Sequence, residues 1–405
     1  MKDYPGSERI LRLDQLEVSN KRVFVRVDFN VPLTDDGKVS DDTRIRASLP
    51  TIQALIAKGA RVICASHLGR PKGKRDEKYT LEPVAARLGE LLGTDVIFAD
   101  NCIGDGIHRQ SRDLRPGQVL VLENLRFHEA EEKNEHDFAF KLSQLCDAYV
   151  NDAFGTCHRA HASTAGLPSL VKARAAGLLL EKEIAALGTL IHNPPRPLVA
   201  ILGGAKVSDK AKVIEALLVK SSKVLVGGAM AYTFLRALQC KTGTSRVETE
   251  MVGLAGRILE RAKTADCKII LPMDHMTGLT FDHPGPAQAT ENAHIPDGRM
   301  GLDIGPRTRA LFAKELEGAA AIFWNGPMGV FEKPPFDEGT TFLAKAIAAN
   351  PAKVKICGGG DSVAAINQAG LESGFTHIST GGGASLEMIE GRTMPGIESL
   401  KQDIG

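Results

Sequence analysis

Residues 198–210 read LVAILGGAKVSDK, and the prediction of the fold starts from this stretch. Five apolar residues run into Gly203 and Gly204, and an amphipathic pattern follows, which together predict a buried strand, a tight turn and a helix. Glycine at the end of a parallel strand lets the backbone turn sharply and approach a ligand closely. The start of the next helix then offers free N–H groups to an anion.

The same arrangement returns in the second half of the chain. Paired or tripled glycines end the apolar runs before positions 227–228, 358–360 and 381–383, and 326–329 reads GPMG as a variant. One Gly-Gly pair is also what an ordinary tight turn uses. Five such turns at one edge of a sheet favour a polyphosphate site, although neither G-x-x-x-x-G-K-[ST] nor G-x-G-x-x-G occurs.

Charged residues stand beside these turns. Lys206 and Lys210 are four residues apart, and we expect them on one face of the starting helix, where they meet phosphate oxygens or coat a solvated surface. Asp361 follows three glycines and is expected to cap a helix, to bind Mg²⁺, or both, because magnesium is typically held by one or two carboxylates together with substrate phosphates.

Short apolar runs alternate with amphipathic stretches along the whole chain, which predicts βαβ units with mostly parallel sheets. We expect strands at 23–27, 61–65, 118–122, 148–150, 198–202, 223–226, 268–271, 320–323, 354–356 and 377–379, with helices including 48–57, 81–92 and 135–145. Two such series predict two Rossmann-like, three-layer α/β/α domains, at 1–176 and 196–384. Residues 177–195 form a connecting helix that Asn193-Pro-Pro-Arg-Pro197 stops.

The first half places basic residues where its strands should end. His67 and Arg70 follow one strand, Arg126 another and Arg159 a third, while Asp28 and Asn30 follow the first, with Arg44 beyond them. Such positions converge on one crevice in an open α/β sheet. Each arginine alone fits a surface position, but together they suit a small anion, because the guanidinium fork meets carboxylate or phosphate oxygens in pairs. The histidines leave a metal site as a minor alternative.

Composition narrows the class further. The 405 residues carry 50 Lys+Arg against 49 Asp+Glu, which argues against nucleic-acid binding through bulk positive charge. Glycine is in excess at 41 residues, whereas average usage of roughly 7% gives about 28. Seven cysteines without a C-x-x-C pair indicate a reduced, cytoplasmic protein, and the charged start MKDYPGSERI together with the lack of a long apolar run predicts neither signal peptide nor membrane span.

Ten motifs follow one another in an order that resembles the phosphoglycerate kinase family. They are VRVDFNVPL, SHLGRP, LENLRFH, NDAFGTCHRAH, ILGGAKVSDK, GGAMAYTF, GLDIGP, WNGPMGVFE, GGGDS and STGGGASLE, and the resemblance extends from about residue 10 to 400. It implies reversible phosphoryl transfer from 1,3-bisphosphoglycerate to MgADP. It also implies a hinge in the connecting helix, which contains Glu183, a tail at 385–405 that returns to the first domain, and a monomer.

The resemblance assigns roles at matching positions. It implies that phosphoglycerate is bound by Asp28, Asn30, Arg44, His67, Arg70, Arg126 and Arg159. It implies that the nucleotide is bound by Gly203, Lys206, Lys210, Gly227, Gly301, Asn325, Glu332, Gly358, Gly359, Gly360, Asp361 and Ser362, with Asp361 on Mg²⁺. Arg44, Lys206, Gly360 and Gly383 would act in catalysis. Ser362 stands where the family usually has threonine, which keeps the hydroxyl.

The implied chemistry agrees with the residues present. The attacking oxygens of ADP and of a carboxylate are already ionised near pH 7, so no general base is needed and His67 is expected to bind substrate or join a network. Two other classes of protein are alternatives. A binding protein that closes on an anion needs no lysine pair and no Mg²⁺ ligand, and a nicotinamide-dependent dehydrogenase is disfavoured by the missing G-x-G-x-x-G.

Overall fold

The computed structural model describes residues 4–402, and these form two compact units. Unit 1 comprises residues up to 188 together with the segment from 393 onward, and unit 2 comprises 189–392. The division therefore falls inside helix α7 (Leu178–His192) and leaves 385–392 in unit 2. Residues 1–3 and 403–405, which belong to the domain and tail ranges expected from the sequence, lie outside the described residues.

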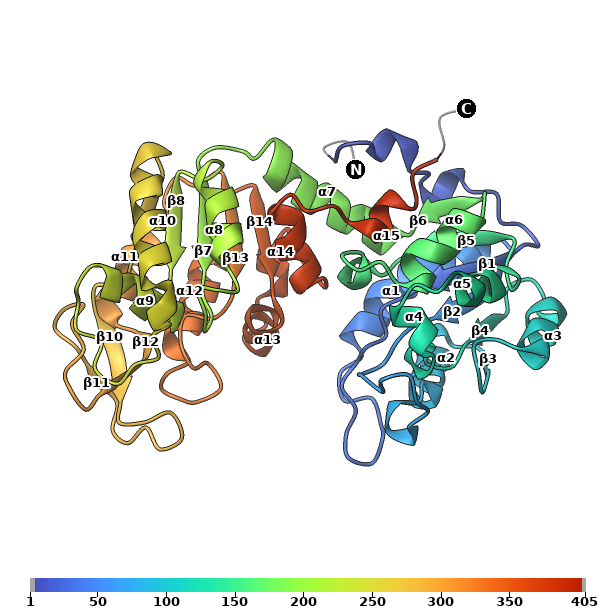
Figure 1. The fold of residues 1–405 in the computed structure, drawn as a ribbon, viewed down its shortest axis with the longest axis horizontal. Helices are drawn as coiled ribbons and strands as arrows, with labels where there is room; N and C mark the ends of the chain where they lie inside the picture. The colour runs from blue at the N-terminus through green and yellow to red at the C-terminus, as the bar shows by residue number, and fades with distance from the viewer. Residues whose placement is uncertain (1–3, 403–405) are drawn as a thin grey trace. The chain divides into compact units, whose positions relative to one another are not determined.

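Unit 1 is built on a six-stranded parallel sheet of order β3-β4-β2-β1-β5-β6 (Figure 1). The strands are β1 (Arg22–Arg26), β2 (Arg61–Ala65), β3 (Val96–Phe98), β4 (Val119–Val121), β5 (Ala148–Asn151) and β6 (Arg174–Ala176). The helices besides α7 are α1 (Thr43–Ala57), α2 (Glu82–Leu92), α3 (Asp105–Asp113), α4 (Glu129–Glu132), α5 (His136–Ser143), α6 (Leu167–Leu170) and α15 (Pro395–Glu398).

Unit 2 repeats this architecture with a six-stranded parallel sheet of order β15-β14-β13-β7-β8-β9. Its strands are β7 (Leu198–Leu202), β8 (Lys223–Val226), β9 (Lys268–Ile270), β13 (Ala321–Asn325), β14 (Val354–Gly358) and β15 (His377–Ile378). The helices are α8 (Ala211–Leu218), α9 (Met230–Ala237), α10 (Val252–Thr264), α11 (Pro306–Glu315), α12 (Glu338–Ala349), α13 (Gly360–Gln368) and α14 (Gly383–Ile389).

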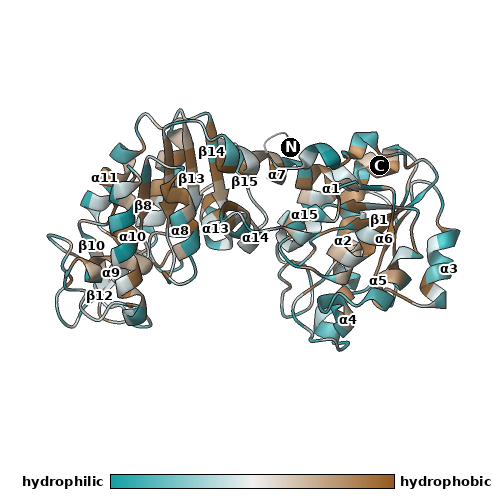
Figure 2. Ribbon diagram, turned by 45° about the horizontal axis from the view of Figure 1, so that its top comes forward, coloured by the Kyte–Doolittle hydropathy of each residue, from teal (hydrophilic) through white to brown (hydrophobic). Residues whose placement is uncertain are grey.

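The cores follow from the two-residue period of the strands. In unit 1, alternate residues of neighbouring strands, such as Val23, Val25 and Val62, are buried in one cluster with Ile52 of α1 and Leu88 of α2. Unit 2 buries its strands in the same way around the fully enclosed Trp324. Figure 2 shows the hydrophobic strands of each unit with more polar helices around them. The expected α/β class with two mostly parallel sheets is confirmed.

Several strands and one helix start were not predicted from the sequence. Strands β3 and β6 have three residues each, and an antiparallel sheet of β10 (His275–Gly278), β11 (Gln288–Ala289) and β12 (Met300–Ile304) was not predicted. Helix α1 begins at Thr43, whereas the sequence predicted a start at Ser48. The prediction was late because the first turn carries charged residues that hide the apolar period. This earlier start places Arg44 on a helix. None of the described helices is long and apolar enough to cross a bilayer.

Candidate active site

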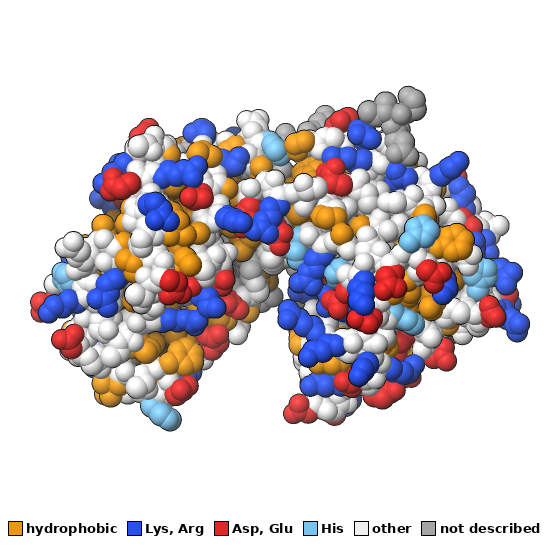
Figure 3. Space-filling view, viewed as in Figure 1, with side chains coloured by type: hydrophobic (Ala, Val, Ile, Leu, Met, Phe, Trp, Pro, Cys, Tyr) orange, Lys and Arg blue, Asp and Glu red, His pale blue; other side chains and the backbone are white. Residues whose placement is uncertain are grey.

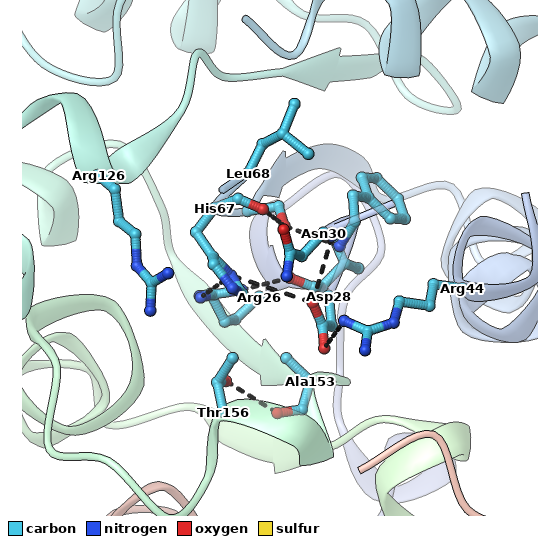
Figure 4. Close-up of polar contacts among 12 residues, drawn as sticks. Arg26, Asp28, Asn30, Arg44, His67, Leu68, Arg126, Ala153 and Thr156 are labelled. Carbon is cyan, nitrogen blue, oxygen red and sulfur yellow. Dashed lines mark hydrogen bonds and ion pairs between the residues drawn. The ribbon is translucent and has the colours of Figure 1, made fainter. Parts of the chain in front are cut away.

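Four adjacent strands of unit 1 end beside the predicted anion-binding residues. Asp28 and Asn30 follow β1, His67 and Arg70 follow β2, Arg126 follows β4 and Arg159 follows β5. The order β4-β2-β1-β5 makes these strands neighbours, and parallel strands bring their carboxyl ends to one edge. With Arg44 of α1, these residues are called the anion half-site below, and Figure 4 shows most of its interior.

Three hydrogen bonds fix the interior of the anion half-site. Nη1 of Arg44 donates to Oδ2 of Asp28 at 2.9 Å, which ties the start of α1 to the end of β1. The side-chain oxygen of Asn30 accepts from the backbone N–H of Gly69 at 2.9 Å, and Nη1 of Arg126 donates to the carbonyl oxygen of the same glycine at 2.8 Å. Gly69, with a φ of +59°, thus has both of its backbone polar groups held by side chains of the site.

His67 is buried in the anion half-site and surrounded by positive charge. Nη2 of Arg26 lies 3.3 Å from Nδ1 of His67, and Oδ1 of Asp28 lies 4.0 Å from the same nitrogen. Burial lowers the pKa of His67 well below its ordinary value, and the charges of Arg26, Arg126 and Arg44 lower it further. A guanidinium can only donate, so Nδ1 accepts and the ring proton resides on Nε2.

The remaining arginines differ in exposure. Arg126 is 4% exposed and its Nε lies 3.3 Å from Oε1 of Glu132. Burial lowers its pKa, against the opposing effect of Glu132. Arg70 and Arg159 are exposed, and Nε of Arg159 donates to Nε2 of His158 at 3.0 Å. The half-site therefore combines a rigid interior with two exposed guanidinium groups.

The five glycine turns of unit 2 lie at the carboxyl ends of neighbouring strands, as the sequence predicts. Strands β15, β14, β13, β7 and β8 are adjacent in that order, and each runs into its glycines. The packing there requires glycine. A Cβ at Gly203 would lie 2.0 Å from the carbonyl oxygen of Pro327, and one at Gly227 would lie 2.4 Å from the sulfur of Met328. These turns and their charged neighbours are called the glycine half-site below.

The two lysines do not share a helix face, contrary to the sequence prediction. Helix α8 begins only at Ala211, so Lys206 lies in the preceding loop and Lys210 is the N-cap residue. Lys206 is exposed. Nζ of Lys210 donates to the carbonyl oxygens of Gly203 at 2.6 Å and Asn325 at 3.0 Å, and to Oδ1 of Asn325 at 2.6 Å. Burial lowers the pKa of Lys210 to about 8, although Asp361 and Asp209 oppose the shift.

Asn325 and Ser362 connect two of the glycine turns, the one at Gly326 and the one at Gly358–Gly360. Asn325, at the end of β13, donates from Nδ2 to the carbonyl oxygen of Gly358 at 2.8 Å. The hydroxyl oxygen of Ser362 accepts from the backbone N–H of Gly326 at 2.6 Å. Both side chains are buried. They hold the turns together rather than face solvent.

Other predicted residues sit around this edge. Helix α13 begins at Gly360 with Gly359 as its N-cap, so the expectation that Asp361 caps the helix is wrong: it is the second helical residue and it is exposed. Glu332 is exposed in a turn after β13, and Gly301 lies in β12 of the small sheet, where Tyr232 packs against it. Gly383 begins α14, and no atom lies within 4 Å of the Cβ position at Gly360 or Gly383.

Comparison with known proteins decides the family. The family model for phosphoglycerate kinase matches residues 13–392. A phosphoglycerate kinase of Anaeromyxobacter dehalogenans is 56% identical over 96% of this chain and 99% of its own, and one of Koribacter versatilis is 52% identical over 96% and 98%. The structure of the Coxiella burnetii phosphoglycerate kinase aligns with a TM-score of 0.87 at 40% identity, covering 97% of this chain and 99% of that one.

The chain belongs to the phosphoglycerate kinase family. It is a phosphotransferase, and its reaction is the glycolytic one of that family, the reversible transfer of a phosphoryl group between 1,3-bisphosphoglycerate and ADP. The resemblance inferred from the ten motifs is thereby confirmed, as is the choice of a kinase over a binding protein or a dehydrogenase.

Phosphoglycerate kinases generally use their nucleotide together with Mg²⁺, and the carboxylate near the glycine turns is compatible with such an ion. Among residues 4–402, no three His, Cys, Asp or Glu side chains are grouped to hold a metal ion, so the alternative of a histidine metal site in unit 1 finds no support there. Asp361 instead offers one exposed carboxylate beside the turn at Gly358–Gly360. A single carboxylate completed by phosphates and waters is a common arrangement for Mg²⁺.

Some residues that organise the two half-sites were missed from the sequence. Arg26 precedes Asp28 and is fully buried, and it contacts both His67 and Ser163. Glu248 accepts hydrogen bonds from the backbone N–H of Ser208 at 3.2 Å and from its hydroxyl at 2.6 Å, and so fixes the loop that carries Lys206. Arg26 could have been suspected, because a charged residue inside an apolar strand needs a buried partner. Glu248 carries no such signal.

Proposed function

We propose that the anion half-site binds the phosphoglycerate. The residues are Asp28, Asn30, Arg44, His67, Arg70, Arg126 and Arg159. The observation that supports this most strongly is the convergence of guanidinium groups and one neutral imidazole at adjacent strand ends. A carboxylate and a phosphate on a three-carbon ligand match that set, because Arg pairs with both groups bidentately.

We propose that the glycine half-site binds the nucleotide. The residues are Gly203, Lys206, Lys210, Gly227, Gly301, Asn325, Glu332, Gly358, Gly359, Gly360, Asp361 and Ser362. Open space at Gly360 and Gly383, together with the backbone N–H groups at the starts of α13 and α14, suits phosphate oxygens. Lys210 then serves a second purpose, because it also holds the turns at Gly203 and Asn325.

Catalysis is assigned to Arg44, Lys206, Gly360 and Gly383. Lys206 is exposed in the loop that Glu248 holds in place, and we expect its ammonium group to stabilise the charge that builds on the equatorial oxygens of the phosphoryl group. No general base is required, because both nucleophiles are ionised at neutral pH. His67 suits that scheme, since its Nδ1 lone pair accepts from Arg26 and only an N–H donor is left for substrate.

Magnesium is proposed to enter with the nucleotide. When bound, Mg²⁺ neutralises phosphate charge and orients the phosphates. Asp361 is the carboxylate in position to hold it, next to the glycine turn that would contact the same phosphates.

Direct transfer requires the two substrates to meet, so hinge closure through α7 and in-line transfer also belong to this proposal. Small-angle scattering with and without both substrates tests the closure: an unchanged radius of gyration in the ternary complex would count against it. A monomer and a cytoplasmic location are likewise proposed, and sedimentation velocity tests the former.

The experiment that tests the half-sites is a pair of binding titrations. Isothermal titration of 3-phosphoglycerate and of MgADP is carried out on Arg126→Ala and Lys210→Gln separately. The first variant should lose only phosphoglycerate affinity and the second only nucleotide affinity. Loss of the opposite ligand in either variant would reverse the assignment.

A further inference from the structure

We propose that Glu131, acting through Ser163 and Arg26, is a positioning residue that holds His67 as a neutral Nε2–H donor in the anion half-site. The part that concerns substrate rests on the proposed function. The part that concerns the ring of His67 rests on the contacts below alone.

The connection is a chain of short contacts between fully buried groups. Glu131, Ser163 and Arg26 each have 0% exposure. The hydroxyl of Ser163 donates to Oε1 of Glu131 at 2.5 Å and accepts from Nε of Arg26 at 2.8 Å. Nη2 of Arg26 then lies 3.3 Å from Nδ1 of His67, a contact visible in Figure 4. The hydroxyl can make both bonds only with its proton directed at the carboxylate.

Ser163 itself is rigidly placed. Its backbone N–H donates to Oε2 of Glu131 at 3.0 Å, and its carbonyl oxygen accepts from the hydroxyl of Tyr149 at 2.9 Å. The residue lies in a five-residue π-helical turn, Ala162–Gly166, and such turns often occur at functional sites. With both backbone groups and the hydroxyl engaged, Ser163 cannot rotate away from Arg26 without breaking a buried hydrogen bond.

The carboxylate of Glu131 supplies, through Ser163, the negative charge that the buried guanidinium of Arg26 needs. A buried guanidinium is costly without a nearby anion. Asp28 is already paired with Arg44 at 2.9 Å. His161 also lies near Glu131, with its Nδ1 3.9 Å from Oε1. Burial and the surrounding arginines lower the pKa of His161 to about 3, so it is neutral and does not compete for the carboxylate.

The consequence falls on His67. While Arg26 is held by Ser163 and by the carbonyl oxygen of Val27, it presents Nη2 to Nδ1 of His67. The ring is then restricted to the Nε2–H tautomer, in which it can donate to an anion and cannot accept a proton at Nε2. If Arg26 were released, both tautomers would become accessible and the donor would be present only part of the time.

The test compares Glu131→Gln and Ser163→Ala with Glu129→Gln, a matched control on the same helix that is 71% exposed and paired with Lys133. Nitrogen NMR of the ¹⁵N-labelled, ligand-free protein distinguishes a protonated from an unprotonated ring nitrogen. In the parent chain and the control, His67 should show an unprotonated Nδ1. In the two test variants the signals of Nδ1 and Nε2 should move toward each other as the tautomers mix.

Steady-state kinetics complete the test. Both test variants should raise KM for 3-phosphoglycerate roughly two- to tenfold, because the apparent affinity falls with the fraction of His67 in the donor tautomer, and leave KM for MgATP unchanged. Unchanged His67 nitrogen signals in both variants would overturn the proposal, and so would an equal rise in both KM values, which indicates general structural damage. Altered signals with an unchanged KM would support the positioning by Glu131 and instead contradict the proposed substrate contact of His67.

Discussion

The ammonium nitrogen of Lys210 lies 2.6 Å from the side-chain oxygen of Asn325, across the gap between the start of α8 and the end of β13. The same nitrogen also donates to two backbone carbonyl oxygens, so one lysine joins two glycine turns. Figure 3 shows Lys and Arg intermixed with Asp and Glu on the face of each unit in view, as expected for a chain of net charge +1.

The affinity for MgADP should fall as pH rises through 8. Lys210 has a pKa lowered to about 8 by burial, so it loses its charge there and attracts phosphate less. Isothermal titration from pH 6.5 to 9.5 measures this, and Lys210→Gln should remove most of the dependence. An equally steep decline in the glutamine variant would assign the effect to another group.

The free energy of unfolding should depend on pH through the buried carboxyl of Asp152. Burial raises the pKa of this carboxyl from 3.8 to about 7, so between those values the folded state binds more protons than the unfolded state. Stability due to this group is therefore greatest below pH 4 and is lost as pH rises through 7. In Asp152→Asn, the difference in unfolding free energy between pH 5 and pH 7.5, measured with urea, should shrink by about 1–3 kcal/mol. An undiminished difference would contradict the assignment.

Lys206→Ala should lower kcat about 100- to 1,000-fold and change KM for either substrate little, because its charge is needed mainly in the transition state. Lys212→Ala, which alters an exposed lysine of α8, is the control and should be near normal. Stopped-flow or steady-state assays in the ATP-forming direction measure both. A rise in KM with normal kcat would make Lys206 a binding residue.

Arg44→Ala should weaken 3-phosphoglycerate binding by about 1.5–3 kcal/mol, since it removes a charge-assisted contact and releases Asp28. The matched control is Arg46→Ala on the same helix, whose side chain is 55% exposed and paired with Asp42. Calorimetric titration compares the two variants. If Arg44→Ala bound 3-phosphoglycerate as tightly as Arg46→Ala, Arg44 would not contact this ligand.

Glycine substitutions should separate packing from catalysis. Gly203→Ala should cost about 1–3 kcal/mol or more in stability, because its Cβ would lie 2.0 Å from a carbonyl oxygen. Gly360→Ala and Gly383→Ala meet no atom within 4 Å, so they should fold normally and yet slow phosphoryl transfer by crowding the phosphates. Thermal melts and kcat on all three variants provide the test. Normal turnover in the last two would remove them from the catalytic set.

The sequence predicted the long parallel strands closely because their apolar runs end in glycine or polar residues. β2, β7 and β8 begin and end where the pattern places them. It missed β3 and β6, whose three residues are too few to show a period, and β10 to β12, whose sequences HMTG, QA and MGLDI contain no continuous apolar run.

The residues at strand ends were predictable from the apolar runs, whereas Gly301 and Glu332 rested on the family resemblance alone, and the contacts within each half-site could not be predicted. The loop before α8 gives Lys206 and Lys210 different surroundings, which four-residue spacing cannot reveal. The chain from Glu131 through Ser163 to Arg26 joins three separate segments of sequence. Only folding brings such groups together, because each lies far from the others along the chain.

The segment beyond residue 393 is hydrogen-bonded into unit 1, where Gly396 donates to Cys157 at 2.9 Å and Gln402 donates to Arg9 at 2.7 Å. Unit 2 is therefore inserted within unit 1 along the chain. During translation, all residues of unit 2 are therefore synthesised before the segment from residue 393 onward, which belongs to unit 1. The anion half-site thus lies in a unit whose six strands are all synthesised before unit 2, although that unit gains its residues from 393 onward only after unit 2.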